Sequence, residues 1–98
     1  MTSFKNLFTP LKVGSMTVKN RLVFLPHRPT FADPGEATIA LIPGPRHVAY
    51  WVERAKGGVG WIGTQGEPVH VDPAQNAFVQ PDSLARFRKL ASAVHQYD

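Results

Sequence analysis

Side chains able to transfer protons or stabilise charge gather in two short segments of the sequence. The segment 26–30 reads Pro-His-Arg-Pro-Thr and follows the apolar run 21–25, and the segment 65–67 reads Gln-Gly-Glu and follows the run 59–64. If both runs are parallel strands, the two segments extend from the same edge of the sheet, which is where α/β proteins bind their ligands. These segments are therefore the candidate functional site.

The composition excludes several kinds of chemistry within these residues. The chain contains no cysteine, so it holds no disulfide, thiolate metal site, iron–sulfur ligand or cysteine nucleophile. The four histidines, at positions 27, 47, 70 and 95, are at least 20 residues apart, which is not the spacing of metal ligands. We expect no metal site in this segment.

The charge and hydropathy patterns limit the partners and the location. The chain carries 11 Lys and Arg against 7 Asp and Glu, a formal charge of +4, but the basic residues are scattered and form no nucleic-acid motif. No apolar stretch reaches the roughly 18 to 20 residues of a membrane span, and the first residues lead into no signal-peptide core. We expect a soluble, cytoplasmic protein that acts on a small-molecule substrate, without nucleic acid or membrane as partner.

The first part of the chain predicts a β-hairpin followed by a buried strand. The runs 11–13 and 16–18 alternate around Gly14-Ser15, a two-residue connection typical of a type II′ or I′ turn. The run 21–25 is almost continuously apolar, as in a strand covered on both faces, and a proline ends it. The segment 31–45, which contains several prolines and glycines, is expected to be a long loop.

Two helices and a second strand are expected in the rest of the chain. One helix begins at Pro45, capped by Gly44, and ends before the glycines at 57–58. The run 59–64 is a second buried strand, and the last helix begins after a cap at Asp82. The core is expected to contain the two tryptophans and the apolar stripe of the last helix, namely Trp51, Trp61, Leu84, Phe87, Leu90 and Val94.

The order of these elements predicts the fold class. A hairpin is followed by strand, helix, strand and helix, and this alternation is typical of a parallel α/β sheet. Two strands cannot cover both faces of a sheet, and an α/β barrel takes about 250 residues. We therefore expect these 98 residues to be a piece of a larger α/β protein.

Two motifs closely resemble the old yellow enzyme family of NADH:flavin oxidoreductases. The first comprises residues 7–14 and the Lys-Asn-Arg sequence at 19–21, and the second is the segment 50–62, which contains Arg-Ala-Lys-Gly-Gly-Val-Gly. The resemblance covers essentially the whole chain and is strongest to the branch of dienoyl-CoA reductases and trimethylamine dehydrogenase. It implies that residues 1–98 are the N-terminal fragment of an FMN-binding TIM-barrel domain, that is, a truncated (β/α)8 barrel.

The resemblance also implies a function and a cofactor site. The parent protein would be an FMN-dependent NAD(P)H oxidoreductase that passes hydride through the flavin to an activated alkene, or that carries out the related oxidation of an amine. The implied FMN contacts are Pro26, His27 and Arg28 after the first strand and Gly66 after the second. A glycine at position 66 would let the flavin approach the main chain without meeting a Cβ atom.

Other parts of the parent enzyme are implied to lie beyond Asp98. They include the catalytic residues that orient the substrate, the groups that bind the ribityl chain and phosphate, and any iron–sulfur cluster or FAD-binding domain of this branch. The full-length protein could be a homo-oligomer. On their own, residues 1–98 are expected to be inactive.

Arg28 departs from the family, in which this position often carries Thr or Cys. Because the chain has no cysteine, the covalent flavin bond of trimethylamine dehydrogenase is excluded here. A guanidinium beside the O4/N5 edge of the flavin would stabilise negative charge on the reduced ring. Alternatively, Arg28 is a solvated loop residue or pairs with a carboxylate, and His27, Glu67 and His70 could equally be ordinary loop residues.

Three other interpretations stay open. The chain could belong to a different flavin- or phosphate-binding barrel, or be a non-catalytic remnant or structural module, or be a basic nucleic-acid module. Residues 53 and 54, a glutamate and an arginine, are expected simply on the helix surface.

Overall fold

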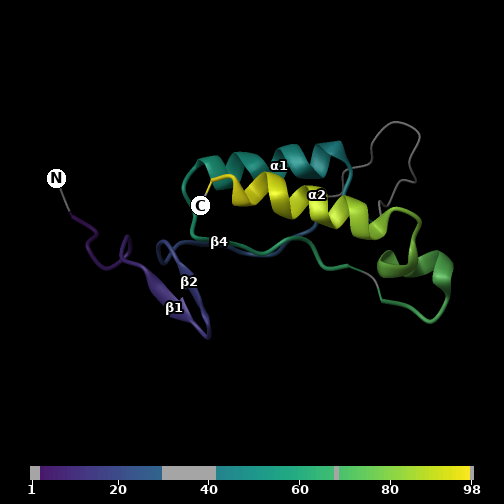
Figure 1. Cartoon of the computed structure of the whole chain (residues 1–98), viewed down its shortest axis with the longest axis horizontal. Coiled ribbons are helices and arrows are strands. Elements are labelled where there is room, and N and C mark those ends of the chain that lie inside the picture. Colours follow the sequence, from purple (N-terminus) through teal and green to yellow (C-terminus); the bar gives the residue numbers. More distant parts are fainter. Residues whose placement is uncertain (1–2, 30–41, 68, 98) are drawn as a thin grey trace.

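The computed structural model describes residues 3–29, 42–67 and 69–97. Within these residues, four strands, two helices and two 3₁₀ turns follow one another: β1 (Leu11–Val13), β2 (Met16–Val18), β3 (Val23–Phe24), α1 (Pro45–Lys56), β4 (Trp61–Ile62), η1 (Pro73–Gln75), η2 (Ala77–Val79) and α2 (Ser83–His95). The two helices lie side by side along one side of the β3–β4 pair, and the β1–β2 hairpin extends from the end of the molecule that holds the N-terminus (Figure 1). Most of the predicted loop 31–45 falls outside the described residues.

The β1–β2 hairpin is confirmed. The strands are antiparallel, with Leu11 opposite Val18 and Val13 opposite Met16. Gly14 has a φ of +60°, whereas Ser15 has no positive φ. Positive φ at the first central position alone is the requirement of a type II′ turn, so the type I′ alternative is excluded.

Strands β3 and β4 form the parallel pair that the alternation of elements predicts. Val23 lies opposite Trp61 and Phe24 opposite Ile62, and α1 makes the crossover between the two strands. Both strands are shorter than the expected runs 21–25 and 59–64. Pro26 ends the ladder because it has no N–H to donate, and the ladder contains only two strands in the part of the chain that the structure describes.

Helix α1 has the predicted bounds. Pro45 is its first residue, the chain leaves it through Gly57, and Gly58 has a φ of +99° that favours glycine. The backbone N–H of Gly44 donates to Nδ1 of His47 at 3.2 Å, so the buried imidazole closes the first turn from within. Trp51 is 1% exposed and forms the centre of the core, as predicted.

Helix α2 differs from expectation at its first turn. Asp82 occupies the N-cap position, but its φ is +62° and its side chain makes no capping hydrogen bond. Leu84 is 65% exposed, whereas Leu90 is buried. Phe87 stacks on Phe78 of η2 with ring centroids 5.6 Å apart. The predicted apolar stripe is therefore only partly buried.

The second tryptophan was also expected in the core, and this prediction was wrong. Trp61 is 44% exposed, and so are Val23 (50%) and Leu25 (71%). The helices cover one face of the β3–β4 pair (Figure 1), and no described element covers the other. No helix in residues 3–29, 42–67 and 69–97 is long and apolar enough to cross a membrane.

Candidate functional site

The chain segments that follow β3 and β4 continue side by side beyond the strands. A Cβ atom on Gly63 would lie 2.5 Å from Cγ of Pro26, so the proline ring rests directly on the glycine backbone. Further along, Nη2 of Arg28 donates a hydrogen bond of 3.0 Å to the carbonyl oxygen of Gly66. The fold thus brings together the two segments that the sequence predicted separately.

His27 packs against an aromatic cluster formed by Phe24, Tyr50 and Trp51. Its Nε2 atom is 2.6 Å from the hydroxyl oxygen of Tyr50, and its Nδ1 atom is 3.4 Å from the carbonyl oxygen of Leu25. The imidazole also meets Phe24 and Trp51 edge to face, with ring centroids 5.3 and 5.5 Å apart. The residue itself is exposed, so the ring is held on one side and open on the other.

Tyr50 and Arg54 are the two members of this cluster that the sequence analysis missed. The Arg54 guanidinium carbon is 3.6 Å from the centroid of the Tyr50 ring, and Nη1 donates to the Tyr50 carbonyl oxygen at 3.1 Å. Arg54, expected on the helix surface, is in fact half-buried in this stack. The spacing of four residues was the available signal, because it places both side chains on one helix face.

Glu67 adds a carboxyl group to the site. Burial raises its pKa above the ordinary value of 4.5, and a hydrogen bond from Gln65 and the positive charge of Arg28 only partly offset this effect. The Gln65 Nε2 atom lies 3.5 Å from Oε2 of Glu67, and the Gln65 side chain is buried. The positive charge of Arg28 acts on the Glu67 carboxyl, whereas the hydrogen bond of the guanidinium goes to the Gly66 carbonyl oxygen.

Gly66 leaves open space beside the main chain. A Cβ atom added there would meet no described atom within 4 Å. One N–H group of Arg28 donates to the Gly66 carbonyl oxygen, and a guanidinium has five N–H donors in all. The site therefore offers an unobstructed stretch of main chain beside a positively charged side chain. These two features fit a flat, electron-accepting ring such as a flavin.

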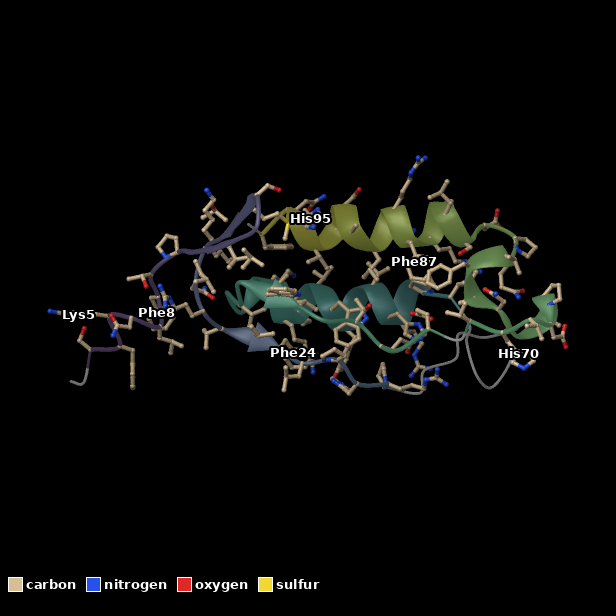
Figure 2. All side chains as sticks on the ribbon, turned by 90° about the horizontal axis from the view of Figure 1, so that it is seen from below. Lys5, Phe8, Phe24, His70, Phe87 and His95 are labelled. Atoms are coloured by element: carbon tan, nitrogen blue, oxygen red, sulfur yellow. The ribbon has the colours of Figure 1, made fainter. Side chains whose placement is uncertain are left out.

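His70, a further candidate residue, takes no part in this cluster. The Nδ1 atom of His70 accepts a hydrogen bond from the backbone N–H of Asp72 at 3.0 Å, and its carbonyl oxygen accepts one from Asn76. Figure 2 shows His70 beyond the strands, well away from Phe24. Thr30 lies outside the described residues. No group of three metal-ligating side chains occurs among the described residues.

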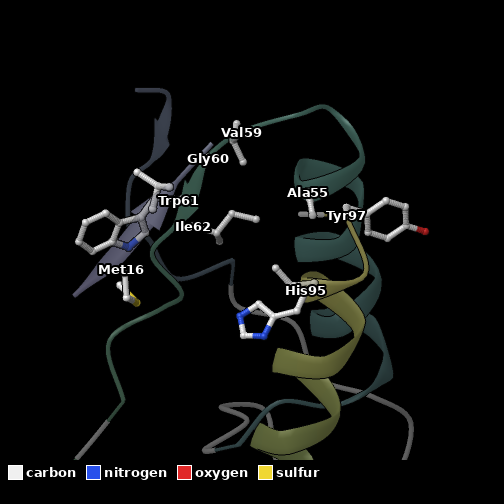
Figure 3. Close-up of a pocket in the computed structure, with 10 residues that line it drawn as sticks. Met16, Ala55, Val59, Gly60, Trp61, Ile62, His95 and Tyr97 are labelled. Atoms are coloured by element: carbon white, nitrogen blue, oxygen red, sulfur yellow. The ribbon is translucent and has the colours of Figure 1, made fainter. Parts of the chain in front are cut away.

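A separate cavity lies at the opposite, amino-terminal end of β4. It has a volume of about 280 Å³, and Met16, Trp61 and Ile62 line it from the strands while His95 and Tyr97 line it from the end of α2 (Figure 3). Its lining is mainly apolar. The cavity is therefore separate from the candidate site, which lies at the carboxyl ends of the strands. Active sites of α/β barrels are found at that carboxyl end.

Comparison with known proteins defines the class of the chain. The model of the NADH:flavin oxidoreductase / NADH oxidase family matches residues 6–98. The chain belongs to this family of FMN-dependent oxidoreductases, and the resemblance inferred from its two motifs is confirmed.

Individual relatives are about one third identical in sequence to this chain. The chain is 34% identical to the N,N-dimethylglycine/sarcosine dehydrogenase of Chromohalobacter salexigens over 97% of its own length, and 32% identical to the NADH oxidase of Thermoanaerobacter brockii over 99%. A solved structure of 2-naphthoyl-CoA reductase with 2-naphthoyl-CoA superposes with a TM-score of 0.80 at 31% identity and covers 97% of the chain. The chain spans only 14% to 15% of the length of these three proteins. Its described residues are mixed α/β and do not close a barrel.

Proposed function

We propose that this chain forms the capping hairpin and the first two β/α units of an FMN-binding (β/α)8 barrel domain in an NAD(P)H-dependent oxidoreductase. The observation that carries the proposal is the contact between the segments 26–28 and 63–67 at the carboxyl ends of a parallel strand pair. Ligands of α/β barrels bind at this edge. The uncovered face that exposes Leu25 and Trp61 supports the completion of the barrel by further strands.

In this proposal the main chain of Pro26, His27 and Arg28 lies along one edge of the flavin, and Gly66 lies against its ring. The open space at Gly66 supports this assignment, because a flat ring can approach there without meeting a side chain. The chemistry that FMN supplies when bound is hydride transfer between NAD(P)H and an organic acceptor.

The contribution of the chain itself is positioning and electrostatics. The Arg28 guanidinium, held by the Gly66 carbonyl, would stabilise negative charge at the neighbouring edge of the ligand. The pairing of β3 with β4 positions the backbone around Arg28 and around Gly66. The guanidinium therefore does not have to move when a ligand binds. Any further catalytic residues, an iron–sulfur cluster or an FAD-binding domain would come from other parts of the protein.

For the substrate we propose a small molecule with an activated carbon–carbon double bond. The 2-naphthoyl-CoA reductase, together with a cinnamate reductase of Clostridium sporogenes that is 36% identical over 62% of the chain, supports reduction. The second candidate is amine oxidation, supported by the similarity to the N,N-dimethylglycine/sarcosine dehydrogenase. A cytoplasmic location and a homo-oligomeric state remain part of the proposal.

The first experiment measures FMN in the purified protein at its natural length. We expect bound flavin, seen as an absorbance band and as quenched fluorescence. Gly66→Ala should weaken FMN binding by about tenfold or more. The unfolding midpoint of the flavin-free protein should stay the same, because the new methyl group meets no described atom within 4 Å. Gly57→Ala, at the end of α1, is the control that adds the same group outside the site. A protein without flavin would instead favour the non-catalytic remnant.

A further inference from the structure

The hydroxyl group of Tyr50 makes the shortest contact of the His27 side chain. The Tyr50 oxygen is 2.6 Å from Nε2, within the range of a strong hydrogen bond. The other ring nitrogen faces the Leu25 carbonyl oxygen, 3.4 Å away. Tyr50 belongs to α1 and His27 to the segment after β3, 23 positions earlier, so this contact ties the helix to the candidate site.

The partners of the two ring nitrogens define one arrangement of protons. A carbonyl oxygen can only accept, so the contact with Leu25 assigns the proton to Nδ1. In a neutral imidazole the other nitrogen then has a lone pair, and Nε2 accepts the hydrogen bond that Tyr50 donates. Both nitrogens are therefore engaged by the protein, and neither faces a ligand as a free proton donor.

Tyr50 is itself held in place from behind. Arg54 stacks on its ring at 3.6 Å and donates to its carbonyl oxygen at 3.1 Å, an arrangement typical of a cation–π contact. The rings of Trp51 and Phe24 meet the Tyr50 ring edge to face at 4.7 and 6.4 Å. With so many neighbours the phenol has little freedom to move, and its hydroxyl group is a fixed point for the imidazole.

We propose that Tyr50 is a positioning residue of the flavin site: its hydroxyl group fixes the orientation and the tautomer of His27 and thereby the main chain from Pro26 to Arg28. This inference rests on the proposed function, because it assigns Tyr50 a role toward the same cofactor. It also assigns His27 a role as a rigid support, and not as an acid or base in the reaction.

The test is a double-mutant cycle on the protein at its natural length, with FMN affinity as the readout. Tyr50→Phe removes one hydroxyl group and keeps the ring that packs on Trp51. It should weaken FMN binding up to about tenfold, the equivalent of one hydrogen bond. In a His27→Phe background the same change should have no further effect, because its partner is already absent. Tyr97→Phe, which removes a hydroxyl group near the end of α2, should leave the affinity unchanged.

A second readout does not depend on flavin. In protein labelled with ¹⁵N-histidine, the ring signals of His27, assigned by their loss in His27→Phe, should report the Nδ1–H tautomer and should shift in Tyr50→Phe. Arg54→Lys, which keeps the charge but removes the planar stack, should weaken FMN binding in the same direction and by less. This variant keeps the inference testable if Tyr50→Phe folds poorly.

The outcomes separate this inference from the proposed function. An unchanged FMN affinity in Tyr50→Phe, or an equal loss in both His27 backgrounds, would overturn the positioning role while the flavin site stands. An Nε2–H tautomer in the wild-type protein would overturn the hydrogen-bond assignment. A wild-type protein that binds no FMN would overturn the proposed function, and the positioning role with it.

Discussion

Nδ2 of Asn20 donates a hydrogen bond of 2.6 Å to the carbonyl oxygen of Gly58. The other atom of the same amide, Oδ1, accepts from the backbone N–H of Leu22 at 3.0 Å. Asn20 is only 7% exposed. The Lys-Asn-Arg motif before β3 and the glycine-rich part of the second motif, just before β4, thus meet in one contact. This contact sets where β3 starts relative to β4, and hence which residues meet beyond the strands.

Replacement of Asn20 should loosen this register. Asn20→Ala removes both hydrogen bonds and leaves the Gly58 carbonyl without its side-chain donor, so we expect the free energy of unfolding to fall by about 1 to 3 kcal/mol. Denaturant unfolding of the protein at its natural length measures the change. Asn6→Ala, an amide in an exposed position, should cost much less. Equal losses in the two variants would show that the contact with Gly58 has no special weight.

Gly60 should tolerate no side chain. A Cβ atom there would lie 2.5 Å from the backbone oxygen of Asn20 and 2.6 Å from its Oδ1 atom. Backbone atoms would have to shift, so Gly60→Ala should lower the free energy of unfolding by about 1 to 3 kcal/mol. Gly66→Ala, where the added methyl group meets no described atom within 4 Å, is the matched control when both variants are denatured without FMN, because bound ligand would itself stabilise the folded state. Unchanged stability in Gly60→Ala would contradict the close approach.

The pH dependence of stability should carry a contribution from Glu67. Burial raises the pKa of this carboxyl above 4.5, so in the pH range just above 4.5 the folded state holds a proton that the unfolded chain has lost. The free energy of unfolding therefore falls as pH rises from 4.5 through the folded-state pKa, and it stays lower above that pH.

Glu67→Gln removes this effect. Relative to wild type, the variant should gain stability as pH rises from 4 to 7, as measured by unfolding midpoints across the range. Glu53→Gln, whose carboxylate is 65% exposed, is the comparison. A difference between Glu67→Gln and wild type that is constant across this range would rule out the raised pKa.

Arg28 should influence the reduction potential of bound flavin. A guanidinium near the ring favours the reduced, more negative state, so Arg28→Ala should lower the potential. For an interaction of about 1.4 kcal/mol the shift is roughly 30 mV for a two-electron couple. Arg28→Lys, which retains the charge, should shift it less. An unchanged potential in the alanine variant would show that Arg28 does not stabilise charge on the flavin. Its role would then be limited to the hydrogen bond with Gly66.

Residues 1–98 produced alone should not behave as a well-ordered monomer. Val23, Leu25 and Trp61 are 50%, 71% and 44% exposed on the strand pair, and strand edges without partners promote association. We expect binding of a hydrophobic dye, broad thermal unfolding and aggregation at micromolar concentration. A sharp, cooperative thermal transition of a monomer would contradict this expectation.

Local signals in the sequence were sufficient for the elements that depend on neighbouring residues. Gly44, Pro45 and the glycines at 57–58 determine where α1 begins and ends, and Gly14 determines the hairpin turn, because each acts on the backbone of its own turn. The position of the candidate site at the ends of two parallel strands also follows from the sequence, since it requires only the order of strands and helices.

Only the tertiary structure decided which side chains meet. Tyr50 and His27 are 23 positions apart, and both the Asn20–Gly58 pair and the Arg28–Gly66 pair are 38 positions apart. No local sequence pattern encodes contacts between residues so far apart in the chain, because these contacts depend on how α1 folds back across the strand pair. The sequence indicated that two strands leave part of the sheet uncovered, but not that Trp61 would lie there: an apolar residue is buried only where another element covers it, and the helices cover one face of the pair alone.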